Sequence, residues 1–228
     1  MDLRRRRIAS ACLIAGLIAT TGCLTTDQDV ETRRAFRLRP LRGIEQVEAP
    51  IPGVLELRRD HAIGGYDEIL VTPGRIDYRM GSDRLTEEAE NAFVKLLRNT
   101  MVDAISEVGI RVAEAPSPCA MQVVFEVAEL DLETRTYAEN LAELIVLMRF
   151  HDSPTGRPLL RYARRQLVPH PEVGTTGDRQ LRTEFQRIVR EMNVTNALRP
   201  AGLATDAKIE GCVGVLGNLG RAATEAAR

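Results

Sequence analysis

The sequence contains no tryptophan, and four Tyr and five Phe are its only aromatic residues. Lysine is almost as scarce, because Lys95 and Lys208 are the only two and every other basic residue is arginine, which we attribute to genomic composition bias. A hydrophobic core must therefore consist of Leu, Val, Ile and Ala, which is adequate for a chain of 228 residues. The apolar run 8–21 is shorter than the about 20 residues that span a bilayer, which argues against a permanent transmembrane helix.

The motifs of common catalytic sites are also missing. His61, His151 and His170 lie far apart, and none belongs to an H-x-x-x-H or H-E-x-x-H pattern. There is no G-x-S-x-G nucleophile elbow and no glycine-rich loop followed by Lys-Ser or Lys-Thr. Asp152, beside His151, is better explained as the side-chain acceptor of a turn. We therefore expect no catalytic residue, no cofactor and no metal site.

The sequence does have an N-terminal export signal. Four arginines, residues 4–7, precede the apolar run, and Ala19-Thr20-Thr21-Gly22-Cys23 closes it. This ending resembles the lipobox of bacterial lipoproteins. The resemblance implies that residues 1–22 are a signal peptide removed before Cys23, and that Cys23 is the lipidation site, carrying acyl chains such as palmitate that anchor the protein to the membrane. The alternative is a signal peptide that is not cleaved, or is cleaved conventionally.

The residues after the signal indicate a location and a tether. Leu24 stands where an inner-membrane retention signal would have Asp, so by analogy with enteric bacteria we expect the outer membrane, facing the periplasm. Residues 23–52 are expected to be the lipidated cysteine and a flexible tether, because three prolines interrupt them. The tether's arginines either contact anionic headgroups or pair with its own acidic residues. Without residues 1–23, 27 basic and 31 acidic residues remain, and a net charge of −4 does not favour a nucleic-acid partner.

Two further cysteines, Cys119 and Cys212, remain once Cys12 leaves with the signal and Cys23 is assigned to lipid. The periplasm is oxidising, and a disulfide between them would close a loop of about ninety residues, worth about 4 kcal/mol in the chain-entropy model. The alternative, which we prefer at this point, is two separate thiols, one at a strand start and one in a tail. No C-x-x-C is present, so neither a redox motif nor a zinc site is indicated.

Hydrophobic periodicity over residues 53–199 predicts one α+β domain. Strands are expected at 54–57, 68–78 with a break or bulge at Pro73-Gly74, 110–112 and 121–128, and residues 141–168 should form a hairpin around the turn 152–156.

Two amphipathic helices complete the predicted domain. One should run over 86–108, with Thr86 as N-cap and Gly109 as the left-handed residue after its end, and the other over 178–193, capped by Asp178. The simplest arrangement is a two-layer sandwich in which both helices cover one face of a mixed or antiparallel sheet, leaving the other face largely solvated. The Gly/Ala-rich tail 200–228 should be loosely ordered.

Several stretches resemble the bacterial lipoprotein family catalogued as domain of unknown function 3313. They are residues 66–73, the helix opening 85–89, the turn 152–156 and the closing helix. The resemblance implies an envelope lipoprotein with an interaction domain and brings no catalytic residue and no ligand. We therefore expect a non-enzymatic binding or scaffolding role with an envelope protein or glycan as partner. The alternative is a periplasmic hydrolase whose site is assembled only in three dimensions.

Overall fold

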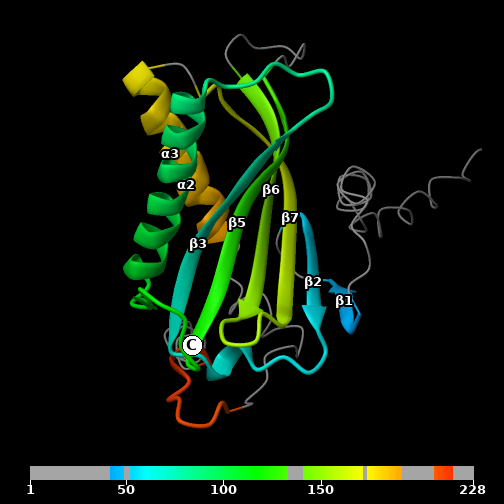
Figure 1. Cartoon of the computed structure of the whole chain (residues 1–228), viewed down its shortest axis with the longest axis vertical. Helices are drawn as coiled ribbons and strands as arrows, with labels where there is room; N and C mark the ends of the chain where they lie inside the picture. The colour runs from blue at the N-terminus through cyan, green and yellow to red at the C-terminus, as the bar shows by residue number, and fades with distance from the viewer. Residues whose placement is uncertain (1–41, 49–51, 133–140, 172–173, 192–207, 218–228) are drawn as a thin grey trace, which may run out of the picture.

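The computed structural model describes residues 42–48, 52–132, 141–171, 174–191 and 208–217. They form an α+β two-layer sandwich in which two long helices lie against one face of a seven-stranded mixed sheet, which confirms the predicted fold class (Figure 1). Among these residues, no helix has both the length and the apolar composition needed to cross a membrane.

The sheet has the strand order β1-β2-β7-β6-β5-β3-β4. Its centre is antiparallel, because β5, β6 and β7 follow one another as hairpins, whereas β3 runs parallel to both β5 and β4. The strands are β1 (Ile44–Val47), β2 (Val54–Arg58), β3 (Glu68–Tyr78), β4 (Arg111–Val112), β5 (Ala120–Asp131), β6 (Leu141–Asp152) and β7 (Pro158–Pro169), and the short 3-10 helix η1 (Ile63–Gly65) precedes β3.

The predicted break in β3 is a bulge. The pairing of β3 with β5 shifts register between Pro73 and Ile76, while the strand continues to Tyr78. Glycine is needed at Gly74, because a Cβ atom there would lie 2.4 Å from the carbonyl oxygen of Phe125. A proline, which has no N–H to donate, is tolerated at such an irregular position of a strand near the sheet edge.

Helix α2 (Glu87–Glu107) forms as the sequence predicts. The Thr86 hydroxyl accepts a hydrogen bond from the N–H of Ala89, and Gly109 has a φ of +77° just after the helix. Helix α3 (Gly174–Glu191) begins four residues before Asp178, so the predicted cap position is wrong. The two helices pack on each other and on the sheet through Phe185, whose ring centre lies 6.0 Å from those of Phe93 and Phe125.

The helix-free face of the sheet, which we call the outer face, is less solvated than expected. The central strand β6 is apolar on both faces, because Leu144 and Val146 face the helices while Ile145 and Leu147 face outward, and all four are at most 6% exposed. A small apolar strip therefore crosses the outer face, consisting of Ala128, Ile145, Leu147 and Ala163.

Two predicted boundaries need correction. Strand β1 lies inside the segment expected to be a tether, because Ile44–Val47 pair with β2 and extend the sheet at that edge. Residues 208–217, within the tail expected to be loosely ordered, pack against the end of the sheet where β3 begins, and Leu216 is only 2% exposed. The remaining parts of the predicted tether and tail lie mostly outside the described residues, as do the signal peptide and Cys23.

Candidate functional site

The three histidines do not form a common site. His61 is buried beside η1, and its Nδ1 accepts a hydrogen bond from the N–H of Ile63. His151 lies near the end of β6 opposite Gln122, and burial together with the charge of Arg149 lowers its pKa. His170 follows β7 at the opposite end of the sheet, because the strand register pairs His151 with Pro158 and Leu141 with Pro169.

Asp152 has the structural role that the sequence indicates. Its Oδ2 accepts a hydrogen bond from the N–H of Thr155 inside the hairpin turn, and its Oδ1 accepts one from the Tyr66 hydroxyl at 2.9 Å. Burial, followed by this bond to a carboxylate, raises the pKa of Tyr66. Asp152 therefore joins the β6–β7 turn to the segment before β3 instead of activating His151.

Residues 208–217, which we call the C-terminal clasp, are fixed to the fold by a carboxylate that binds backbone N–H groups. Asp67 Oδ1 accepts hydrogen bonds from Val213, Gly214 and Val215 at 3.1, 2.7 and 3.1 Å. Burial alone would raise the pKa of Asp67, but the three donors outweigh it and the pKa lies below its ordinary value. The N–H of Leu216 also donates to the Tyr66 carbonyl at 3.0 Å.

The glycines of the clasp allow this close approach. Gly214 has a φ of +81°, and a Cβ atom on Gly217 would lie 2.9 Å from the carbonyl oxygen of Gly64. Gly211, Gly214 and Gly217 recur at every third position, a spacing that keeps to no single face of an α-helix. The structure explains two of them, because Gly214 and Gly217 lie against the Gly64-Gly65 pair.

A disulfide joins Cys119 to Cys212 and ties the clasp to the start of β5, with the two Cα atoms 5.5 Å apart. The structure thus differs from our preference for two separate thiols. Asp67 Oδ atoms and the two sulfurs form the only group of three potential metal ligands among the described residues, lying within 4.8 Å of one another. Because the sulfurs are bonded to each other, this group is a structural junction.

Ion pairs occupy the outer face on either side of the apolar strip. Arg79 contacts Asp131 at 2.5 Å and Glu143 at 2.6 Å, and Arg165 contacts Glu143 at 3.2 Å. Burial would raise the pKa of Glu143, but the two arginines outweigh it and lower that pKa. Two further cross-strand pairs complete the arrangement, Glu126 with Arg149 and Glu56 with Arg161.

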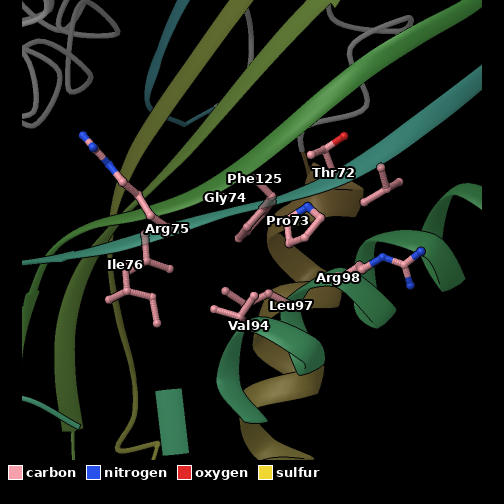
Figure 2. A pocket seen from close by; sticks show the side chains of 11 residues that line it. Thr72, Pro73, Gly74, Arg75, Ile76, Val94, Leu97, Arg98 and Phe125 are labelled. Atoms are coloured by element: carbon pink, nitrogen blue, oxygen red, sulfur yellow. The ribbon is translucent and has the colours of Figure 1, made fainter. Parts of the chain in front are cut away.

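A hollow lies on the helix side of the sheet, between β3 and α2. Its cavity volume is only about 10 Å³, roughly enough for one water molecule, and its floor is apolar: Val71, Ile76, Val94, Leu97, Phe125 and Val127 line it. Figure 2 shows Pro73 and Phe125 from the sheet facing Val94 and Leu97 from the helix, with Arg98 beside them. We call it the α2–β3 hollow. No histidine or carboxylate lines it, so its chemistry is that of apolar contact.

Comparisons with known proteins were made for sequence and for structure. No family model and no curated protein matches the sequence, so membership of domain of unknown function 3313 is not shown.

Several solved structures resemble the fold. The PelC dodecamer from Paraburkholderia phytofirmans is 12% identical, covering 65% of this chain and 94% of that one, with a TM-score of 0.35. A minor lipoprotein from Acinetobacter baumannii is 12% identical, covering 58% and 96%, with a TM-score of 0.33. A DUF4136 family protein from Bacteroides thetaiotaomicron is 9% identical, covering 73% and 100%, with a TM-score of 0.35. Similarity at this level assigns neither a family nor a function to the chain.

Proposed function

We propose that this protein is a bacterial envelope lipoprotein, anchored through an acylated Cys23, whose folded domain binds another envelope component and is not an enzyme. The main support for a location in the cell envelope is the Cys119–Cys212 disulfide. Disulfides persist in oxidising compartments such as the periplasm and are rare in the cytosol. The disulfide supports export independently of the lipobox, because it lies in the folded domain and not in the signal.

A binding role, rather than catalysis, is supported by the structural role of two carboxylates near one end of the sheet. Asp67 and Asp152 are both held by structural hydrogen bonds, and within the described part of the chain neither is paired with a histidine. The α2–β3 hollow is apolar, and its volume of about 10 Å³ is far below the roughly 300–1,000 Å³ of small-molecule sites. The competing hypothesis, a periplasmic hydrolase, requires a cleft that holds several His, Asp, Glu or Ser groups together.

The anchor is tested by mass spectrometry of the protein from its native membrane. Wild-type protein should begin at Cys23 and carry acyl chains, whereas Cys23→Ser should accumulate as an unprocessed precursor. Cys12→Ser is the matched control, because Cys12 lies in the removed signal and its replacement should leave processing unchanged. An unmodified Cys23 in the wild type would refute the lipoprotein assignment.

The binding role is tested by crosslinking in the intact envelope. We expect a stable partner to be recovered with the lipidated protein and the protein to fractionate with the outer membrane. Recovery of no partner, or hydrolysis of envelope substrates by the purified protein, would count against a purely binding domain. Fractionation with the inner membrane would contradict the expectation drawn from Leu24.

A further inference from the structure

The Cys119–Cys212 disulfide lies where reagents in solution can reach it. Both cysteines are half-buried, so burial alone does not protect the bond. Breaking the bond would leave the clasp held by noncovalent contacts, such as its hydrogen bonds to Asp67 and the packing of Leu216. The chemical surroundings of the two sulfurs therefore decide how readily the covalent closure of the clasp is lost.

Oxygen atoms that carry negative charge lie close to both sulfurs. A carboxylate oxygen of Asp67 lies within 4.8 Å of each of them. The Gly211 carbonyl oxygen lies 3.7 Å from the Cys119 Sγ. The Glu210 carbonyl oxygen lies 3.8 Å from the Cys212 Sγ. Because the sulfurs of a disulfide have no proton to donate, these oxygens make the approach of an anion to the bond unfavourable.

Asp67 is the carboxylate whose charge remains when its charged neighbours are considered. Burial would raise its pKa, but the clasp N–H groups and Arg111 lower it below the ordinary value, so the group is ionised at neutral pH. Arg111 itself contacts Glu68 at 2.6 Å, and these two charges largely cancel. Lys208 and Glu210 of the clasp are both exposed and have opposite charges. Together these described groups leave one negative charge beside the disulfide.

Reduction of a disulfide by thiols requires negative charge at this place. A thiolate sulfur bonds to one cysteine sulfur, the S–S bond breaks, and the other cysteine leaves as a thiolate. A second external thiolate then attacks the mixed disulfide and releases the first cysteine, so that two electrons pass from two external thiols to the protein. The attack brings a negative charge toward Asp67, and the departing cysteine thiolate places one beside it. A fixed carboxylate charge therefore opposes both events.

We propose that Asp67 has a second role besides holding the clasp: its charge protects the Cys119–Cys212 disulfide from anionic thiols, so that the clasp stays closed in their presence. The same carboxylate thus binds the clasp through hydrogen bonds and slows the loss of the covalent bond that closes it. This inference goes beyond the proposed function and does not rest on it, because it concerns neither the anchor nor the partner. Failure of the lipidation or crosslinking experiments would leave it unaffected.

The test compares how fast two monothiols of similar size and opposite charge reduce the full mature protein in an uncharged detergent. They are 2-mercaptoethanesulfonate, which is anionic, and 2-aminoethanethiol, which carries an ammonium group. Protein thiols are alkylated at timed intervals and counted by mass spectrometry, and each rate per thiolate is divided by the rate with a neutral small disulfide. At low ionic strength, we expect the aminothiol to be favoured about threefold or more with wild-type protein. Asp67→Asn should remove most of that preference, and high salt should weaken it in the wild type.

Two controls separate the effect of charge from loosening of the clasp. Asparagine keeps an oxygen that can accept the clasp N–H groups, and tris(hydroxypropyl)phosphine, a neutral reductant oxidised to its phosphine oxide with oxygen from water, should reduce Asp67→Asn and wild-type protein at similar rates. Asp83→Asn removes an exposed carboxylate beyond the opposite end of β3 and should leave the thiol preference unchanged.

Four outcomes would overturn the proposal. They are a wild-type protein without a preference between the two thiols, an Asp67→Asn variant that keeps the wild-type preference, an equal effect of Asp83→Asn, and an Asp67→Asn variant that all three reductants reduce faster by the same factor. The last outcome would show that Asp67 acts only by holding the clasp in place.

Discussion

Removing the Cys119–Cys212 disulfide should destabilise the domain substantially. The two cysteines are 93 residues apart, so the bond closes a loop that contains β5, β6, β7 and α3. In the chain-entropy model a loop of this length restricts the unfolded chain by about 4–5 kcal/mol, and measured losses for native disulfides are about 2–5 kcal/mol. For a domain of this size each kcal/mol shifts the Tm by about 2–4 °C, so a fall of roughly 10 °C is expected.

Urea unfolding of oxidised and reduced protein measures this loss directly. Cys119→Ser, Cys212→Ser and the double variant should all lose about the same free energy of unfolding, because either substitution alone removes the bond. Losses that add up in the double variant would show two independent thiols. Thiol titration of the unfolded, unreduced mature protein should find no free thiol from this pair, and detection of two would refute the pairing.

Three further substitutions test the core, the clasp and the bulge. Leu97→Asp should cost more than about 3 kcal/mol in urea unfolding, since it buries a charge between α2 and the sheet, while Lys95→Ala on the exposed side should be nearly neutral. The pKa of Asp67 is lowered in the folded state, so it adds stability above its ordinary pKa of about 3.9 that is lost as pH falls through the folded value. Asp67→Asn should therefore flatten the pH dependence of the urea midpoint in acid, and an unchanged profile would contradict this. Gly74→Ala should lower the Tm more than Gly109→Ala, because only the former meets backbone atoms.

Helix α2 and the β6–β7 hairpin were predictable because their signals are local. The Thr86 cap, the apolar stripe and Gly109 all lie within one stretch of chain, and the observed helix agrees to within one residue at each end. The turn at Asp152 likewise depends on side chains no more than four residues apart. The sequence does not predict that α3 begins at Gly174, because Asp178 is the first clear cap signal and the residues before it have weak helix propensity.

The clasp could not be derived from local pattern. Asp67 lies 146–148 residues before the N–H groups from which it accepts hydrogen bonds, and Cys119 lies 93 residues before Cys212. The sequence of a glycine-rich stretch does not indicate which distant carboxylate will accept hydrogen bonds from its backbone. The signal that was available was the glycine spacing itself, because glycines that fit no helix face indicate turns and close backbone contacts. Strand β1 is absent from the prediction for a different reason: four residues are too few for a clear alternating pattern and they lie among prolines, although their partner β2 is the next strand in the chain.

The sequence does indicate that part of the outer face is apolar and buried. Residues 144–148 are uninterrupted Leu-Ile-Val-Leu-Met, and a strand that is apolar at every position is buried on both faces. An alternating pattern predicts that Ile145 and Leu147 face solvent, whereas the structure buries both. On the neighbouring strands the same face carries arginine and carboxylate pairs, which keep their charges compensated next to that apolar strip.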